Sequence, residues 1–398
     1  CDWSSDVCSS DLVNQDLVIY RWIPHGSRKL EDLHLLNTGS KDYYLSNPMM
    51  LCHDQEPLIW NFYSRDEIKN HTKNDYLKHN PECLPNDQAL EYHVDQYLRS
   101  IMACANQYDL TLLLHSEQHS DQLQLFVEHG FVPVYYWSHG LIAQDWFRYA
   151  QHDPRLVFDF SQITKDFLVY NRAWGGTREY RLYFTQSLYE HNLLDHVQTT
   201  FNPRDQVHYT QHVFKNQKFQ ISNYNLEQCL QPCLVDSTAS ADYNNIDYAN
   251  TGIEVVLETI FDDTRWHLTE KILRPIACGK PFILASTPGS LEYLRNYGFK
   301  TFQGLIDESY DQISDSSARL HAIILEMKRI AALDSRDKLD LYKELHEIAK
   351  YNKQWFFTGL MDQILTEYKT NLDQAMITMR QHCTGKHYAS IQALIAQN

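Results

Sequence analysis

The sequence is short of basic residues relative to acidic ones. Its 398 residues include 35 Lys and Arg but 51 Asp and Glu, which gives a formal net charge of −16 at pH 7. A protein that binds the nucleic-acid backbone over a broad surface normally presents a basic face, so this balance argues against nucleic acid as a partner. It does not argue against a small local cluster of cations that binds one anionic ligand.

Long apolar runs, low-complexity segments and internal repeats are also missing. No apolar stretch approaches the roughly 20 residues of a transmembrane helix, so we expect no transmembrane segment. Hydrophobic residues still make up 43% of the chain and the mean hydropathy is −0.49, which is typical of a packed globular protein rather than a disordered one. The length is too great for one ordinary core and predicts two domains.

The cysteines form neither a disulfide framework nor a zinc motif. Two of the nine lie in the first 12 residues, and the other seven are scattered apart from Cys229 and Cys233. Nothing elsewhere completes a metal-binding pattern around that pair. Free thiols are typical of a reducing compartment, so we expect a cytoplasmic protein.

The first 12 residues, CDWSSDVCSSDL, do not have the features of a signal peptide. They contain no initiating Met, no basic segment and no apolar segment. They resemble a translated sequencing-adapter read-through, so we expect residues 1–12 to be a non-native prefix and leave them out of the fold prediction.

Apolar runs typical of strands alternate with amphipathic stretches typical of helices, the pattern of a parallel-sheet α/β protein. Strands are expected at residues 16–22, 109–115, 131–137, 167–171, 197–201, 253–259 and 281–286. Helices are expected at 90–104, 118–129, 177–191, 269–278, 290–297, 318–332, 338–351 and 355–372. We therefore predict two Rossmann-like α/β domains, residues 13–160 and 161–312, and a helical C-terminal extension, residues 313–398.

One predicted helix breaks two rules of helix formation. Thr269 is a good N-cap and Gly279 a good C-terminal stop, but Lys271 places a cation in the first turn, where the helix dipole disfavours it by up to about 1 kcal/mol. Pro275 lies in the helix interior, where proline normally costs about 3 kcal/mol. Such exceptions cluster at functional sites. A cation beside free N–H groups is favourable if an anion binds there, and Arg265, shortly before the cap, could add a donor.

A similar arrangement occurs about a hundred residues earlier. A strand expected to end at Asn171 is followed by Arg172 and then by the pair Gly175-Gly176, where the backbone could approach a phosphate closely. The next helix is expected to begin at Thr177, with Arg178 as a cation in its first turn. Open α/β sheets bind ligands at the carboxyl ends of their strands. The two helix starts together therefore predict a diphosphate site.

Two carboxylates could complete this site. Glu258 is expected at the end of a strand and Glu270 at the start of the helix, where either could accept a hydrogen bond from a ribose or sugar hydroxyl. The alternative is that Lys271 and Arg178 are ordinary solvated cations and that Pro275 is a harmless kink.

These segments carry a resemblance to a known family. The blocks TEKILRPIACGKPFI and VYNRAWGGTREYRLYFTQSLYEHNLLD resemble donor-site motifs of GT-B glycosyltransferases of the fucosyltransferase-like group, and of uncharacterised glycosyltransferase-like proteins of bacteria and phages. The resemblance covers about residues 169–302 and lacks the flanking residues usual in fucosyltransferases. It implies a GT-B arrangement, a nucleotide-sugar donor, Arg178 and Lys271 on the diphosphate, and Glu270 on the ribose or sugar. It also implies inverting transfer of a hexosyl or fucosyl type.

An inverting transfer needs a general base for the acceptor hydroxyl, and a partly buried carboxylate suits that role. Glu56, followed by proline, is similar to the segment that supplies the base in fucosyltransferases, and Glu117, near a strand end, is the rival candidate. His53, His115 and His139 are weaker candidates.

We expect no metal and no cofactor, because the nucleotide-sugar is itself a substrate. Arg172, Arg178 and Lys271, with two helix N-termini, could neutralise the leaving diphosphate in place of Mg²⁺, and no Asp-x-Asp motif marks the donor half. The expected acceptor is a glycan or a lipid-linked hydroxyl. One alternative is a kinase-like or sulfo-group transferase, although the P-loop motif is missing. The other is a non-catalytic nucleotide- or glycan-binding module on the same fold.

Overall fold

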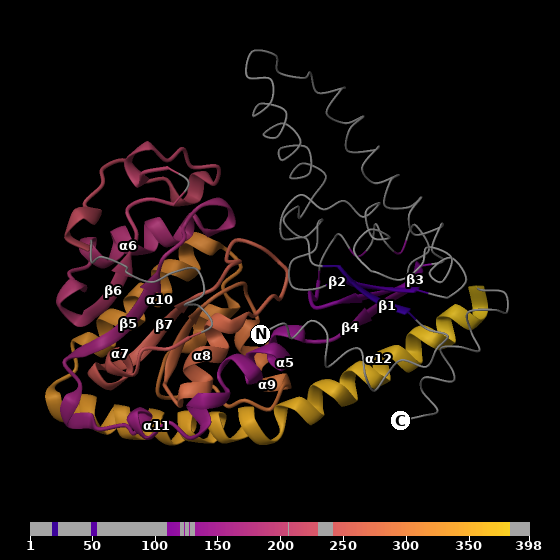
Figure 1. The fold of residues 1–398 in the computed structure, drawn as a ribbon. Coiled ribbons are helices and arrows are strands. Elements are labelled where there is room, and N and C mark those ends of the chain that lie inside the picture. Colours follow the sequence, from indigo (N-terminus) through magenta and orange to yellow (C-terminus); the bar gives the residue numbers. More distant parts are fainter. Residues whose placement is uncertain are drawn as a thin grey trace, which may run out of the picture. The chain divides into compact units, whose positions relative to one another are not determined.

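The structure is a computed structural model, and it describes residues 18–22, 49–53, 110–119, 123, 127, 132–205, 207–229 and 242–382. The chain divides into two compact units (Figure 1). The first comprises Cys1–Ser138 and Leu365–Asn398, and the second comprises His139–Ile364. This division by contacts differs from our sequence-based boundaries after residues 160 and 312, which remain predictions.

The first unit contains a parallel sheet in the order β1-β2-β3-β4. Its strands are β1 (Val18–Trp22), β2 (Met49–His53), β3 (Leu110–His115) and β4 (Val132–Tyr135). Three of them confirm the predicted strands at 16–22, 109–115 and 131–137, whereas β2 was not predicted. The helix expected at 90–104 lies outside the described residues. Of the helix expected at 118–129, Gln118 and His119 are described and are not helical, so the predicted start is wrong, whereas Leu123 and Val127 are helical.

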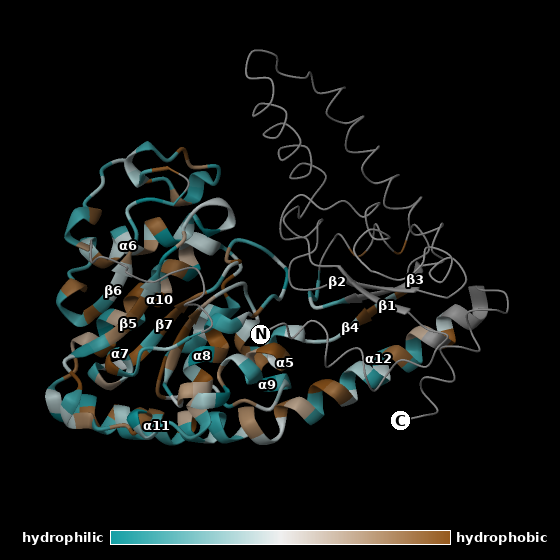
Figure 2. Ribbon diagram, viewed as in Figure 1, coloured by the Kyte–Doolittle hydropathy of each residue, from teal (hydrophilic) through white to brown (hydrophobic). Residues whose placement is uncertain are grey.

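The second unit contains a parallel sheet in the order β6-β5-β7-β8. Its strands are β5 (Lys165–Asn171), β6 (Val197–Phe201), β7 (Thr251–Leu257) and β8 (Phe282–Ala285), which confirms the four predicted for this half. Every residue of β7 and β8 is buried, as expected for strands covered on both faces, and Figure 2 shows apolar residues along this sheet.

The side on which the chain adds strands to the second sheet changes between β5 and β7. From β5 the chain moves to β6 on one side, and it later returns to form β7 and then β8 on the other side. The carboxyl ends of β5 and β7 therefore flank a topological switch point, where open α/β sheets place their ligands.

Helices surround this sheet. They are α5 (Ser138–Trp146), α6 (Tyr180–Glu190), α7 (Asn245–Asn250), α8 (Glu270–Cys278) and α9 (Ser290–Asn296). Helix α8 follows its prediction closely, because the Thr269 side chain accepts a hydrogen bond from the N–H of Lys271 and Gly279 adopts the left-handed conformation that ends the helix. Pro275 lies inside the helix, as predicted.

The predicted start of α6 is wrong. A 3₁₀ turn spans Gly176–Arg178 and α6 begins only at Tyr180, and the Thr177 hydroxyl donates to the carbonyl of Thr259 instead of capping the helix. Thr177 is therefore not an N-cap, and Arg178 precedes the helix rather than lying in its first turn.

The C-terminal part is helical, as predicted. It contains α10 (Ser316–Ala331), α11 (Ser335–Thr358) and α12 (Leu360–His382), and none of the described helices is long and apolar enough to span a membrane. Trp355 was expected to open the last helix but belongs to α11. The break falls at Gly359, where an added Cβ would lie 2.2 Å from the Trp355 ring.

Candidate functional site

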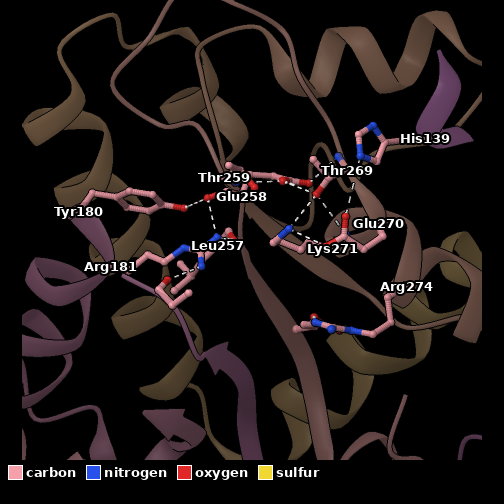
Figure 3. A network of polar contacts seen from close by, with 12 residues as sticks. His139, Tyr180, Arg181, Leu257, Glu258, Thr259, Thr269, Glu270, Lys271 and Arg274 are labelled. Atoms are coloured by element: carbon pink, nitrogen blue, oxygen red, sulfur yellow. Dashed lines mark hydrogen bonds and ion pairs between the residues drawn. The ribbon is translucent and has the colours of Figure 1, made fainter. Parts of the chain in front are cut away.

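The predicted donor-site segments meet at the switch point of the second sheet. Residues 172–178 follow β5, and residues 258–269 follow β7 and lead into α8. The hydroxyl of Tyr180 donates to the carbonyl of Glu258 (2.5 Å), and the hydroxyl of Thr177 donates to the carbonyl of Thr259 (3.2 Å). Figure 3 shows Tyr180, Glu258 and the start of α8 in one polar network.

Arg181 is a central residue of this network that the sequence did not single out. Its guanidinium is buried and donates to the carbonyls of Ala173 (2.7 Å), Leu257 (2.7 Å) and Glu258 (2.9 Å) (Figure 3). One side chain thus holds the loop after β5 against the end of β7. The three carbonyls lie in different segments, and no sequence spacing indicates such an arrangement.

Glu258 is fully buried, and its carboxylate is engaged by the chain itself. It accepts hydrogen bonds from the N–H of Thr269 (3.0 Å), from the Thr269 hydroxyl (2.8 Å) and from the N–H of Thr259 (3.1 Å). The carboxylate therefore fixes the N-terminus of α8. For Glu258 to bind a sugar hydroxyl as predicted, the ligand would have to share or replace one of these bonds.

The two predicted residues at the end of β5 differ in their surroundings. The Asn171 side chain is fully buried and donates to the Arg181 carbonyl (3.0 Å) and to the Thr185 hydroxyl (2.8 Å), so it joins β5 to α6. Arg172 is half-buried, and within the described part of the chain its side chain has no hydrogen bond or ion pair. A cation of this kind is suited to an anionic ligand.

The glycine loop after β5 already holds an anionic side chain. The N–H groups of Trp174 and Gly175 donate to one carboxylate oxygen of Asp205, at 2.9 Å and 2.7 Å. We predicted that this backbone approaches a phosphate. In the structure, an internal carboxylate occupies that part of the loop.

At the start of α8, Lys271 lies between two oxygen atoms of its own turn. Its ammonium is 2.6 Å from a carboxylate oxygen of Glu270 and 3.2 Å from the hydroxyl of Thr269. Burial raises the pKa of Glu270, but the charge of Lys271, the charge that His139 carries when it is protonated and the hydrogen bonds to the carboxylate outweigh burial and lower the pKa to about 2. Glu270 is therefore ionised, and it offsets the unfavourable cation in the first helical turn.

Two histidines complete this cluster. Nε2 of His139 lies 4.0 Å from the other carboxylate oxygen of Glu270, and its ring packs edge-on against His267 with centroids 5.1 Å apart. Burial and the charges of His139, Arg265 and Lys271 hold the pKa of His267 well below its usual value, so His267 is neutral. Arg265 forms an ion pair with Asp263 at 2.6 Å, so the extra donor expected there is committed to a carboxylate.

Of the predicted general bases, His139 belongs to the second unit and the other four belong to the first. Glu56 lies outside the described residues. Glu117 is buried beyond the end of β3, and its carbonyl accepts a hydrogen bond from Nδ1 of His115 (3.0 Å). Burial lowers the pKa of His115 to about 4, so this imidazole is neutral at pH 7. His53 ends β2.

No group of three or more His, Cys, Asp or Glu side chains in the described residues is arranged to hold a metal ion. In comparisons with known proteins, no family model, no curated protein and no solved structure matches the chain.

Proposed function

We propose that the protein is a glycosyltransferase that moves a sugar from a nucleoside-diphosphate donor to a glycan or lipid-linked hydroxyl acceptor. The observation that supports this function is the meeting of two segments, after β5 and after β7, at a topological switch point. Both segments carry cations, and the second ends at the N-terminus of α8. This is a suitable place for the diphosphate of the donor.

The charges at this point suit a diphosphate. Lys271 stands at a helix N-terminus, whose free N–H groups and dipole favour negative charge. Arg172 is half-buried without an internal partner in the described residues, and Arg178 lies in the 3₁₀ turn that closes the loop. These cations would stabilise the leaving diphosphate without Mg²⁺, which is the basis for proposing metal-independent transfer.

The acceptor side of the proposal rests on the first unit. We propose a GT-B arrangement in which the first unit binds the acceptor, with Glu56 or Glu117 as the general base of an inverting hexosyl or fucosyl transfer. The base removes the hydroxyl proton as the acceptor oxygen attacks the anomeric carbon, and the nucleoside diphosphate leaves with the bonding electron pair. Glu56→Gln should abolish transfer and retain donor binding.

Donor binding can be tested directly. We expect one of GDP-, UDP-, ADP- or CMP-linked sugars to raise the melting temperature of the full chain. Lys271→Ala and Arg178→Ala should each weaken the binding of that donor by about 10- to 100-fold, the effect of one charge-assisted contact. Lys343→Ala, which removes an exposed lysine of α11, is the matched control and should leave affinity unchanged. No stabilisation by any nucleotide-sugar would refute the donor site.

A non-catalytic nucleotide- or glycan-binding module is the second candidate. It is favoured by the internal engagement of Glu258 and Asn171, two predicted site residues that hold the fold together. Stabilisation by a nucleotide-sugar without hydrolysis or transfer of the sugar would support this module over the enzyme.

A further inference from the structure

The carboxylate of Glu270 faces two different groups that can carry positive charge. One oxygen lies 2.6 Å from the ammonium of Lys271, and the other lies 4.0 Å from Nε2 of His139. Figure 3 shows the carboxylate between these two side chains, with Lys271 and Glu270 on α8 and His139 at the head of α5. The first distance is that of a tight ion pair, and the second is too long for a hydrogen bond.

The charges around His139 oppose one another. Glu270 favours the protonated imidazole, whereas Lys271 on the same helical turn disfavours it. The segment before α8 contributes the neutral ring of His267 and, near that ring, Arg265 with its partner Asp263. His139 and Glu270 are both buried, so water screens these interactions weakly.

We propose that Glu270 exchanges its carboxylate between Lys271 and His139, so that a diphosphate bound at Lys271 is accompanied by uptake of one proton at His139. When the anion attracts the ammonium of Lys271, Glu270 loses its cationic partner and turns to Nε2 of His139. The imidazole then takes one proton from solvent and becomes an imidazolium paired with the carboxylate. Glu270 is a positioning residue in this scheme, and His139 is the group that titrates.

Only the identity of the anion in this scheme rests on the proposed function. The link between Lys271, Glu270 and His139 is a property of the ligand-free protein and can be measured without any ligand. Binding and proton uptake are reciprocal, so the diphosphate should bind more tightly as the pH falls through the range in which His139 titrates.

The ligand-free test is the titration of His139 by NMR. The full chain would be labelled at its 20 histidines, and His139 would be assigned from the signal lost in His139→Gln. Lys271→Met imitates the departure of the ammonium and should raise the pKa of His139 by about 0.5 to 1 unit. Glu270→Gln removes the favourable charge and should lower it by about 1 unit.

Two controls accompany this titration. Lys271→Arg keeps the charge and Lys343→Met removes an exposed charge that is paired with Asp340, so both should titrate as the unaltered protein does. An unchanged or lower pKa of His139 in Lys271→Met would overturn the proposal. If that variant does not fold, Glu270→Gln decides: an unchanged pKa there would overturn the proposal equally.

The ligand arm uses inorganic pyrophosphate and calorimetry in buffers of different ionisation enthalpy. We expect the unaltered protein to take up as much as one proton more per bound pyrophosphate than His139→Gln does, because proton exchange by the pyrophosphate itself is common to both proteins. Binding with equal uptake in both proteins would overturn the proposed link and leave the anion site intact. Absence of binding would count against the proposed function, while the ligand-free titration still decides the link between the three side chains.

Discussion

The carboxylate of Asp205 accepts a hydrogen bond of 2.7 Å from the N–H of Gly175, across 30 residues of sequence. The same oxygen also accepts from the N–H of Trp174. The loop after β5 is therefore held by an internal anion, and an external phosphate is not needed to satisfy these two donors.

Asp205→Ala should destabilise the protein by about 1–3 kcal/mol, because two N–H groups lose their acceptor. Millimolar phosphate should recover part of the loss if the vacated loop accepts an external anion. Urea unfolding with and without phosphate measures both effects. Asp195→Ala, which removes an exposed carboxylate, is the control and should change stability by less than about 0.5 kcal/mol. A loss of equal size in both variants would contradict this role of Asp205.

Arg181→Lys should be strongly destabilising although it keeps the charge. A lysine ammonium cannot reach the carbonyls of Ala173, Leu257 and Glu258 together as the planar guanidinium does. We expect a loss of about 2–3 kcal/mol in the free energy of unfolding, and weaker binding of whichever donor stabilises the unaltered protein. Chemical unfolding measures the loss of stability, and calorimetric titration measures the affinity for the donor. Unchanged stability would contradict the role of Arg181 in joining the two segments.

The ion pair between Arg274 and Glu254 is buried beneath the site, at 2.5 Å. Glu254→Gln leaves an unpaired buried guanidinium and should reduce the free energy of unfolding by about 3–5 kcal/mol. The exposed pair of Lys343 and Asp340 offers the matched comparison, since Asp340→Asn should change stability by less than about 1 kcal/mol. Equal losses of stability in Glu254→Gln and Asp340→Asn would show that burial of the ion pair is not the cause of the loss.

Lys280 should make stability depend on pH in the alkaline range. Burial lowers the pKa of Lys280 from 10.5 to about 7, while its ammonium donates to the carbonyls of Tyr248 and Thr251. Between these two values the unfolded chain binds more protons than the folded one, so stability should rise with pH from about 7 to 10.5, by up to about 1.4 kcal/mol per unit. Lys280→Met should flatten this slope, and Lys343→Met should retain it.

Much of α8 could be predicted from the sequence because its determinants are local. Thr269, Gly279 and the apolar spacing between them specify the start, the end and the buried face of one short helix. The strands of the second sheet were predictable for the same reason, since each is a short apolar run. The start of α6 was misplaced because the Thr177 hydroxyl, a local capping candidate, instead donates to the carbonyl of Thr259 in a segment 82 residues away.

The polar contacts of the site could not be predicted. Arg181 donates to carbonyls 8 and 77 residues away, and Asp205 accepts from an amide 30 residues away, so each pairing depends on the strand order of the folded sheet. The sequence placed Lys271 and Glu270 at a helix start but gave no indication that His139, from a distant helix, would face the same carboxylate.

Glu258 joins two helix starts at once, through its carbonyl to Tyr180 and through its carboxylate to Thr269. The hydrogen bonds between Glu258 and Thr269 therefore close the loop that runs from residue 258 to residue 269. A protease cut at residues 262–264 of this loop would break the chain without releasing either helix. The nicked protein should keep the starts of α6 and α8 together, because the backbone carbonyl and the carboxylate of Glu258 hold them without an unbroken chain between Glu258 and Thr269.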